Sequence, residues 1–290
     1  MRIERVSEIG LLVTDLEAAT RLYRDILGGE MSEVVSPAGD GRWRICRFRN
    51  IDLRLMESAT ANGAGDGAAR GSDRIQYVGL RVASVTDVRN SLTERGIAVA
   101  DEKPRGAQDL PAAFVDPAAF HGVRFKLVAG KYDLVFSASS ARNFETPVDR
   151  LLHVGINVRD LDTAMRRFAD IFELPYTVSY YRPVYGLRFA FLRAGNVDLE
   201  LLAPSTPEGL IARSIDKVGE GIAHLCWSTP NITATLDWLR EHRCRLIDEQ
   251  PMTIQNLRAA FVHPEAFNGV LHELVEGEHR FFESDTPQIL

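Results

Sequence analysis

The chain has 290 residues, of which 45% are hydrophobic and 26% charged, and this predicts a globular protein of about two domains. Its net charge of −6, with Lys and Arg scattered along the chain, argues against nucleic acid as a partner. Acidic residues stand near the N-terminus where a secretory signal would be apolar, and no uncharged run reaches membrane-spanning length. We therefore expect a cytoplasmic protein with no membrane partner. The three cysteines are far apart and predict neither a disulfide framework nor a zinc knuckle.

An internal repeat divides the chain into two halves. The stretch IGLLVTDLEAATRLYRDILGG from Ile9 matches VGINVRDLDTAMRRFADIFEL from Val154 at an offset of 145 residues. Farther along, FVDPAAFHGVRFKLVAG matches FVHPEAFNGVLHELVEG at an offset of 147 residues. Because the offset drifts by only two residues, the repeat indicates a duplicated module. We predict a first module over residues 1–130, a linker over 131–150, a second module over 151–277 and a tail over 278–290.

Each half is predicted to contain strand, helix and three strands, twice over. In the second half the strand HVGINV begins at His153, a helical pattern follows Asp160, and the order restarts with HLCWST at His224. Apolar runs of period two predict the strands, and apolar residues three and four apart predict the helices. Asp15 and Asp160 are predicted to cap the first helix of each half. Residues 58–74, rich in Gly and Ala, are predicted to form a mobile loop.

Four side chains of the second half are predicted to share one face of a sheet, because alternate residues of a strand point the same way. His153 and Glu200 are 47 residues apart, and His224 and Glu273 are 49 apart, so each repeat supplies a His from its first strand and a Glu from its last. His272 must point to the opposite face from its neighbour Glu273. Two neutral imidazoles and two carboxylates form a set suited to one divalent metal ion, which could be Co, Mn, Ni, Zn or Fe.

This arrangement resembles the vicinal oxygen chelate superfamily, which includes glyoxalases, bleomycin resistance proteins and extradiol dioxygenases. The resemblance rests on HVGINVRDLDTAMRRFADIFEL, VDLELLAP, GEGIAHLCW and FVHPEAFNGVLHELVE, and the second half is most similar to methylmalonyl-CoA epimerase. It implies an α+β fold in which two tandem modules, each of paired βαβββ units, form cup-shaped mixed sheets. The metal ligands that it implies fall on His153, Glu200, His224 and Glu273.

The two carboxylates are the predicted catalytic groups. Glu200 and Glu273 come from different repeats, so pseudo-symmetry should place them on opposite sides of the ion, where each can exchange a proton. A divalent ion supplies Lewis acidity to a carbonyl or 1,2-dioxygen unit of a small-molecule substrate. We therefore predict a metal-dependent epimerase or isomerase that acts on an acyl thioester or a polyol ketone.

Two other classes of function stay open. Duplication and length favour an extradiol-type ring-cleaving dioxygenase with His153, His224 and Glu273 as a facial triad on Fe(II), although Glu200 would then occupy a position that oxygen or catechol needs. A non-enzymatic ligand-binding or resistance protein is the third class, and four metal ligands argue against it. A homodimer is also left open.

Polar and aromatic side chains near the predicted site are candidate substrate contacts, namely Asn157, Arg182, Tyr185 and Arg188. One acidic residue that epimerases carry 17 positions before the second ligand would fall on Pro183, so that acid/base group is missing here.

The first half has lost the metal ligands. The equivalent positions carry Glu8, Arg54, Tyr77 and Lys126, a set that no divalent ion would select. We predict an internal ion-pair cluster in this half, which then contributes to the core interface. The functional alternative is an anion pocket that uses Arg54 and Lys126.

Overall fold

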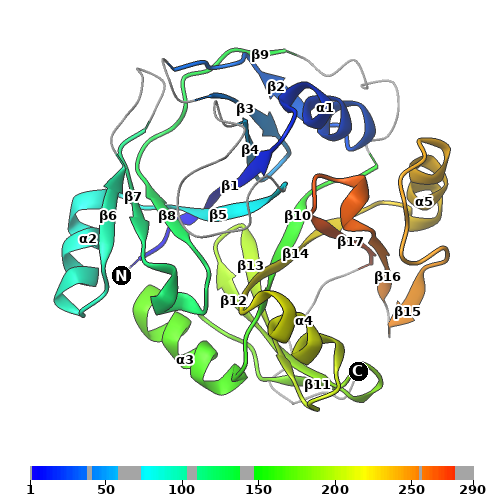
Figure 1. The fold of residues 1–290 in the computed structure, drawn as a ribbon. Coiled ribbons are helices and arrows are strands. Elements are labelled where there is room, and N and C mark those ends of the chain that lie inside the picture. Colours follow the sequence, from blue (N-terminus) through cyan, green and yellow to red (C-terminus); the bar gives the residue numbers. More distant parts are fainter. Residues whose placement is uncertain are drawn as a thin grey trace.

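The structure, a computed structural model, describes residues 2–37, 41–57, 73–102, 110–137, 147–254 and 257–277. Within these ranges the first half forms a nine-stranded curved sheet and the second half an eight-stranded one (Figure 1). The predicted mobile loop lies outside the described residues from 58 to 72, and so does the predicted tail. No helix in the described ranges has both the length and the apolar character needed to cross a membrane.

The first sheet has the strand order β6-β7-β8-β5-β1-β4-β3-β2-β9. Its elements are β1 (Arg5–Val13), α1 (Leu16–Arg21), the π-helical turn η1 (Leu22–Ile26), β2 (Glu30–Ser32), β3 (Arg42–Arg47), β4 (Asp52–Glu57), β5 (Arg74–Arg81), α2 (Val85–Glu94), β6 (Val99–Glu102), β7 (Ala112–Val115), η2 (Pro117–Phe120), β8 (Phe125–Val128) and β9 (Phe136–Ser137).

The second sheet has the strand order β11-β12-β13-β10-β14-β17-β16-β15. Its elements are β10 (Leu151–Asn157), α3 (Leu161–Phe172), β11 (Tyr180–Arg182), η3 (Pro183–Tyr185), β12 (Leu187–Ala194), β13 (Val197–Pro204), α4 (Leu210–Val218), β14 (Gly221–Ser228), α5 (Ile232–Glu241), β15 (Met252–Ile254), β16 (Leu257–Val262), η4 (Pro264–Ala266) and β17 (Leu271–Glu276).

The pairing of the strands confirms the predicted βαβββ units. In each unit the first strand pairs in parallel with the last, as β1 with β4 and β10 with β13, because a helix carries the chain back across the sheet. The two units of a module meet through antiparallel first strands, β1 with β5 and β10 with β14. The predicted caps are also confirmed: the Asp15 carboxylate accepts from the Ala18 N–H at 2.9 Å, and Asp160 accepts from Thr163 at 2.8 Å.

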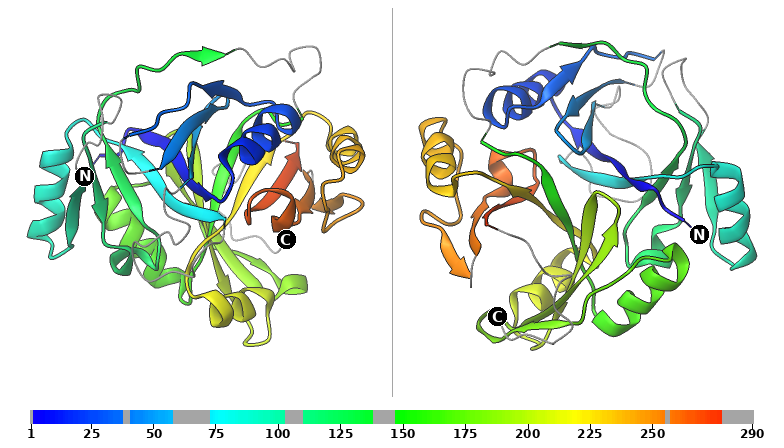
Figure 2. Two further views of the ribbon diagram at one scale, coloured as in Figure 1. Left: turned by 45° about the horizontal axis from the view of Figure 1, so that its top comes forward. Right: turned by 180° about the vertical axis from the view of Figure 1, so that it is seen from behind.

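One hydrophobic core joins the two modules. The Phe120 ring after β7 stacks on Phe172 of α3 with centroids 4.6 Å apart, and Phe48 packs on Trp227 at 4.7 Å. On the other side of the molecule the indole N–H of Trp238 donates to the carbonyl of Ile26 at 3.1 Å. The second unit of each module therefore lies beside the first unit of the other, as Figure 2 shows from two further directions. This packing turns the opposite, concave face of each sheet away from the shared core.

The stretch predicted as the linker takes part in the first sheet. β9 lies within this stretch and pairs with β2. Three side chains of the stretch, Tyr132, Leu134 and Phe136, pack against Trp43 and Ile45. These side chains cover part of the concave face of the first sheet. The connection between the modules thus partly fills the first cup.

Candidate metal centre

The four predicted ligands stand on four adjacent strands of the second sheet. His153 is on β10, Glu200 on β13 and His224 on β14. Gly155 of β10 pairs with Glu200 on one side and with His224 on the other. Glu273 on β17 pairs with Cys226, which is two residues after His224 on β14. Because strand partners on one face have neighbouring side chains, this register brings all four groups to the centre of the cup.

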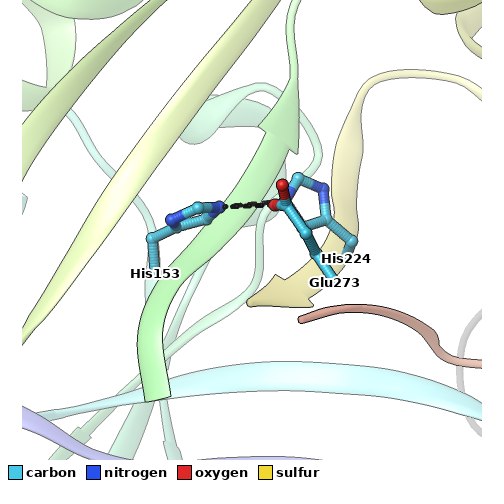
Figure 3. Close-up of side chains that lie close together, drawn as sticks. All are labelled: His153, His224 and Glu273. Carbon is cyan, nitrogen blue, oxygen red and sulfur yellow. Dashed lines mark hydrogen bonds and ion pairs between the residues drawn. The ribbon is translucent and has the colours of Figure 1, made fainter. Parts of the chain in front are cut away.

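The ligand atoms converge on one point. The two imidazole Nε2 atoms of His153 and His224 are 3.1 Å apart. Glu273 Oε2 lies 3.2 Å from the first and 3.3 Å from the second. Figure 3 shows the three side chains pointing toward one another. Glu200 Oε2 lies 3.3 and 3.4 Å from the same two nitrogens. Each carboxylate therefore contacts both imidazoles.

These separations fit a divalent ion. An ion about 2.1 Å from each ligand atom, with angles of 90–110° between ligands, separates neighbouring ligand atoms by about 3.0–3.4 Å. The ligand atoms of His153, His224 and Glu273 all lie within 4.8 Å of one another. Glu200 falls outside this group of three, although its Oε2 contacts both imidazoles. Two neutral nitrogens and two carboxylates are also the chemistry that such an ion selects.

The carboxylates and the imidazoles shift one another's pKa values, because all four groups lie close together and are largely shielded from solvent. His153, Glu200 and His224 are 3%, 8% and 5% exposed. Burial raises the pKa of Glu200, but the adjacent imidazoles outweigh it and hold that pKa at about 2. Burial lowers the pKa of His224, whereas hydrogen bonds to Glu200 and Glu273 raise it above its usual value. The carboxylates are therefore charged, and a cation binding here would displace protons from the imidazoles.

His272 points away from the centre, as predicted. Its Nδ1 accepts from the indole N–H of Trp227 at 2.8 Å, and its ring packs against Phe267 at 5.0 Å. Burial in this core lowers the pKa of His272 to about 3. The residue therefore stays neutral and supports the strand that carries Glu273.

Walls of aromatic side chains flank the candidate metal centre on two sides, and these side chains are not among the residues predicted from the sequence. The Phe191 ring lies 5.4 Å from that of His153 and belongs to a cluster with Tyr180 and Phe189. On the other side, Phe261 lies 6.0 Å from His224. The alternation in RFAFLRAG could have revealed the first wall, because it puts Phe189 and Phe191 on the face shared with the ligand on β13.

Three of the four predicted substrate contacts lie on the cup side. Asn157 is buried and donates to Ser214 Oγ on α4 at 3.2 Å. The Arg182 guanidinium lies 5.7 Å from the ring centre of Tyr185, which packs against the aromatic wall and donates to Met252 Sδ. These contacts place α4 and η3 next to the cup.

Arg188, the fourth predicted substrate contact, lies on the opposite side of the sheet. On β12 it alternates with Phe189, so it points to the helical side of the sheet. There its guanidinium contacts Asp162 on α3 at 3.2 Å and Ser179 at 3.1 Å. The structure does not bring Arg188 to the centre, because the strand period places it on the wrong face.

The first cup holds an ion-pair cluster at the positions equivalent to the predicted metal ligands. Glu8 accepts from the hydroxyls of Tyr77 at 2.9 Å and Tyr132 at 2.6 Å, and Lys126 Nζ lies 3.5 Å away. Burial raises the pKa of Glu8, but Lys126 and Arg54 outweigh it, so the pKa is lowered and the group is charged. Tyr132 comes from the stretch predicted as the linker, so the repeat alignment could not reveal it.

Replacing Lys126 by Met should lower the free energy of unfolding by about 3 kcal/mol, because the buried Glu8 carboxylate loses a cation 3.5 Å away and Glu102 loses its partner at 2.9 Å. Denaturant unfolding would measure this loss, with metal content unchanged. The exposed Lys217→Met serves as a control and should change little. A selective loss of substrate binding in Lys126→Met would instead support an anion pocket in this cup.

Gly155→Ala should weaken metal binding about 10–100-fold, because a Cβ at this position would lie 2.1 Å from the His224 ring and displace that ligand. Gly10→Ala is the matched control: its Cβ would lie 2.2 Å from the Tyr77 ring at the equivalent place in the first cup. It should reduce stability and leave metal affinity unchanged. Competition with a metal-sensitive dye would measure both affinities, and equal affinities would contradict the assigned centre.

Comparison with known proteins supports the fold and its family. The family model described as Glyoxalase/Bleomycin resistance protein/Dioxygenase superfamily matches residues 7–114 and 152–261. The chain is 31% identical over 130 residues to ethylmalonyl-CoA/methylmalonyl-CoA epimerase of Cereibacter sphaeroides, covering 44% of this chain and 97% of that protein. It is 29% identical over 152 residues to the mitochondrial methylmalonyl-CoA epimerase of Mus musculus, covering 48% and 85%.

A solved structure resembles the chain over both modules. It is a mutant of 4-hydroxymandelate synthase from Streptomyces coelicolor, with a TM-score of 0.72 and 19% identity, covering 97% of this chain and 95% of that one. At this identity the likeness concerns the fold alone. Since the family model matches both halves, the chain belongs to the glyoxalase/bleomycin resistance protein/dioxygenase superfamily and carries two tandem modules of it.

Proposed function

We propose that this protein is a divalent-metal-dependent epimerase or isomerase that moves the proton next to a chelated carbonyl. The observation that carries the proposal is the geometry of the two carboxylates. Glu200 and Glu273 come from equivalent strands of two repeats, and each contacts both imidazoles at 3.2–3.4 Å. A bound divalent ion would supply Lewis acidity to the substrate carbonyl. The candidate ligands for it are His153, Glu200, His224 and Glu273.

The carboxylates supply the proton transfer. One carboxylate oxygen removes the proton from the α-carbon on one face, and the other carboxylate returns a proton on the opposite face. Two opposed acid/base groups are what inversion of a carbon centre needs. Both carboxylates are held in the charged state, so either can act as the accepting base, and the one that returns a proton must first take it up from solvent.

The walls and Asn157 would bind and shield the substrate. The aromatic cluster beside His153 excludes water and strengthens the electrostatic interactions inside the cup. Asn157 Oδ1 is buried and has no hydrogen-bond partner within the described ranges, although its amide nitrogen donates to Ser214. It would accept a hydrogen bond from a polar group of the substrate.

An acyl thioester is the favoured substrate class, because the relative from Cereibacter sphaeroides is named as an ethylmalonyl-CoA/methylmalonyl-CoA epimerase. A polyol ketone is the alternative. The acidic residue that epimerases carry at the position of Pro183 is absent, and Pro183 begins η3 beside the cup. Proton transfer is therefore assigned to Glu200 and Glu273 alone.

Incubation with methylmalonyl-CoA in D₂O tests the proposal. We expect deuterium at the α-carbon, inversion of the centre, no oxygen uptake, and loss of both reactions after treatment with a chelator. Inversion without deuterium would point to a shielded transfer by one base. Absence of both reactions, in protein that retains its ion, would exclude this thioester and direct the assay to polyol ketones.

A dioxygenase is the second candidate. The ligand atoms of His153, His224 and Glu273 lie within 4.8 Å of one another, a grouping that also suits the two-His, one-carboxylate triad of Fe(II) oxygenases. The contacts of Glu200 with both imidazoles favour the four-ligand set instead. Iron in the purified protein, together with oxygen uptake on catechols, would reverse this preference.

A further inference from the structure

We propose that the first module contains a second binding site, for the carboxylate or phosphate group of a small metabolite. A cavity of about 300 Å³ opens at the edge of the first sheet, where β1 and β4 begin and β5 ends. Its volume is that of a small-molecule site. It lies on the first module, whereas the four metal ligands all belong to strands of the second sheet.

The cavity is strongly cationic in a chain of net charge −6. Five cations line it against two carboxylates, Glu8 and Asp52, and one of the five, Arg49, also pairs with Asp149 at 2.8 Å. The cations are Arg5, Arg47, Arg49, Arg81 and Lys131.

Internal contacts already neutralise both carboxylates. Arg47 binds Asp52 through two nitrogens, at 2.9 and 3.1 Å. Glu8 is engaged by Lys126 and by the hydroxyls of Tyr77 and Tyr132. Neither carboxylate forms an ion pair with Arg5 or Arg81 in the described ranges, although the charge of Asp52 raises the pKa of Arg5 in part.

Arg5 and Arg81 are the pair that needs an anion. They stand directly opposite each other on β1 and β5, and like charges in that position destabilise a sheet. No carboxylate pairs with either of them within the described ranges, and Arg81 Nε is buried without a hydrogen-bond partner there. Burial lowers the pKa of Arg5, and the neighbouring Arg81 lowers it further.

The geometry suits an oxyanion. Two Arg5 nitrogens donate to backbone carbonyls, Nε to that of Val6 at 3.3 Å and Nη2 to that of Asn50 at 2.8 Å, and the remaining N–H groups can turn to a ligand. A guanidinium binds carboxylate and phosphate oxygens through two parallel N–H groups. One oxyanion between Arg5 and Arg81 would satisfy the buried N–H and cancel the repulsion between the two strands.

The cavity also lies at the junction of the modules. The Asn50 side chain donates to the carbonyl of Leu151 at 2.8 Å and accepts from the Leu151 N–H at 3.0 Å. Leu151 begins β10, two residues before His153. An anion bound against Arg5 would therefore stabilise the contact between the modules as well as the first sheet.

Thermal unfolding with added anions tests the site. Inorganic phosphate or malonate, compared with chloride at the same ionic strength, should raise the Tm of the wild type by about 2–4 °C for a chain of this size. Arg81→Gln should abolish the rise, and without anion its Tm should be no lower than that of the wild type, because the repulsion is removed. Arg5→Gln gives the same test should Arg81→Gln fail to fold.

Arg89→Gln is the matched control, because Arg89 is in the same module but pairs with Asp101 on the surface. It should respond to anions like the wild type. A response to phosphate alone identifies a phosphate-bearing ligand, and a response to malonate alone identifies a dicarboxylate. A rise that persists in Arg81→Gln would place the anion elsewhere, including on the metal centre, and would overturn the proposal. No rise with either anion in the wild type would overturn it as well.

Discussion

Replacing Glu200 or Glu273 by Gln should lower turnover by about 10²–10⁴-fold, while the metal ion largely remains bound. Gln keeps an oxygen that can coordinate, but it cannot accept a proton, so the loss is the one typical of a removed general base. Each variant is incubated with methylmalonyl-CoA in D₂O, and proton exchange is followed separately from inversion. In a two-base mechanism one variant should still exchange the proton on one face and fail to invert the centre.

Asp198→Asn is the matched control. Asp198 is on the same strand as Glu200 and is also buried, but its carboxylate pairs with Arg193 at 3.3 Å instead of with both imidazoles. Its turnover should stay within a few-fold of the wild type. Unchanged turnover in both Gln variants, or an equal loss in Asp198→Asn, would mean that the two carboxylates do not carry the proton.

Removing either imidazole should empty the metal centre. In His153→Ala or His224→Ala the ion loses one of two nitrogen ligands, and each carboxylate keeps only one of its two imidazole contacts. We expect metal content, measured by elemental analysis after dialysis, to fall from about one ion per chain to near zero. His242→Ala, which alters an exposed His bonded to the carbonyl of Trp238, should retain the full ion.

Two outcomes would contradict this assignment. Two ions per chain in the wild type would mean that a second centre exists, since the Glu8 and Lys126 cluster of the first cup should exclude a cation. Full occupancy in the double variant His153→Ala with His224→Ala would place the ion elsewhere.

The sequence alone was sufficient to predict the fold class, because a repeat with a nearly constant offset and a strand period of two constrain topology strongly. The same period put His153, Glu200, His224 and Glu273 on one face, and it excluded His272. Local chemistry also sufficed for the helix caps, since a cap depends only on residues three positions apart.

Other features depend on contacts between segments far apart in the chain. Arg188 is predicted as a substrate contact because it stands near the strand that leads to Glu200, whereas the strand period places it on the opposite face, where it contacts Asp162 and Ser179. No periodicity could show that Tyr132 reaches Glu8, because 124 residues separate them. The aromatic wall at Phe191 differs, because the alternation in RFAFLRAG could have placed it on the face of Glu200, as the pairing of β12 with β13 does.

Only the tertiary structure decided how the two modules divide their roles. Sequence patterns report which face of an element is apolar, but they do not report which other element covers that face. The shared core arises when the two sheets pack. The connecting chain partly fills the first cup because β9 pairs with β2, and Arg5 stands beside Arg81 because β1 pairs with β5. A linear pattern does not encode where charged side chains lie in three dimensions. The tertiary structure therefore shows a candidate metal centre in the second cup and a cationic cavity at the edge of the first sheet.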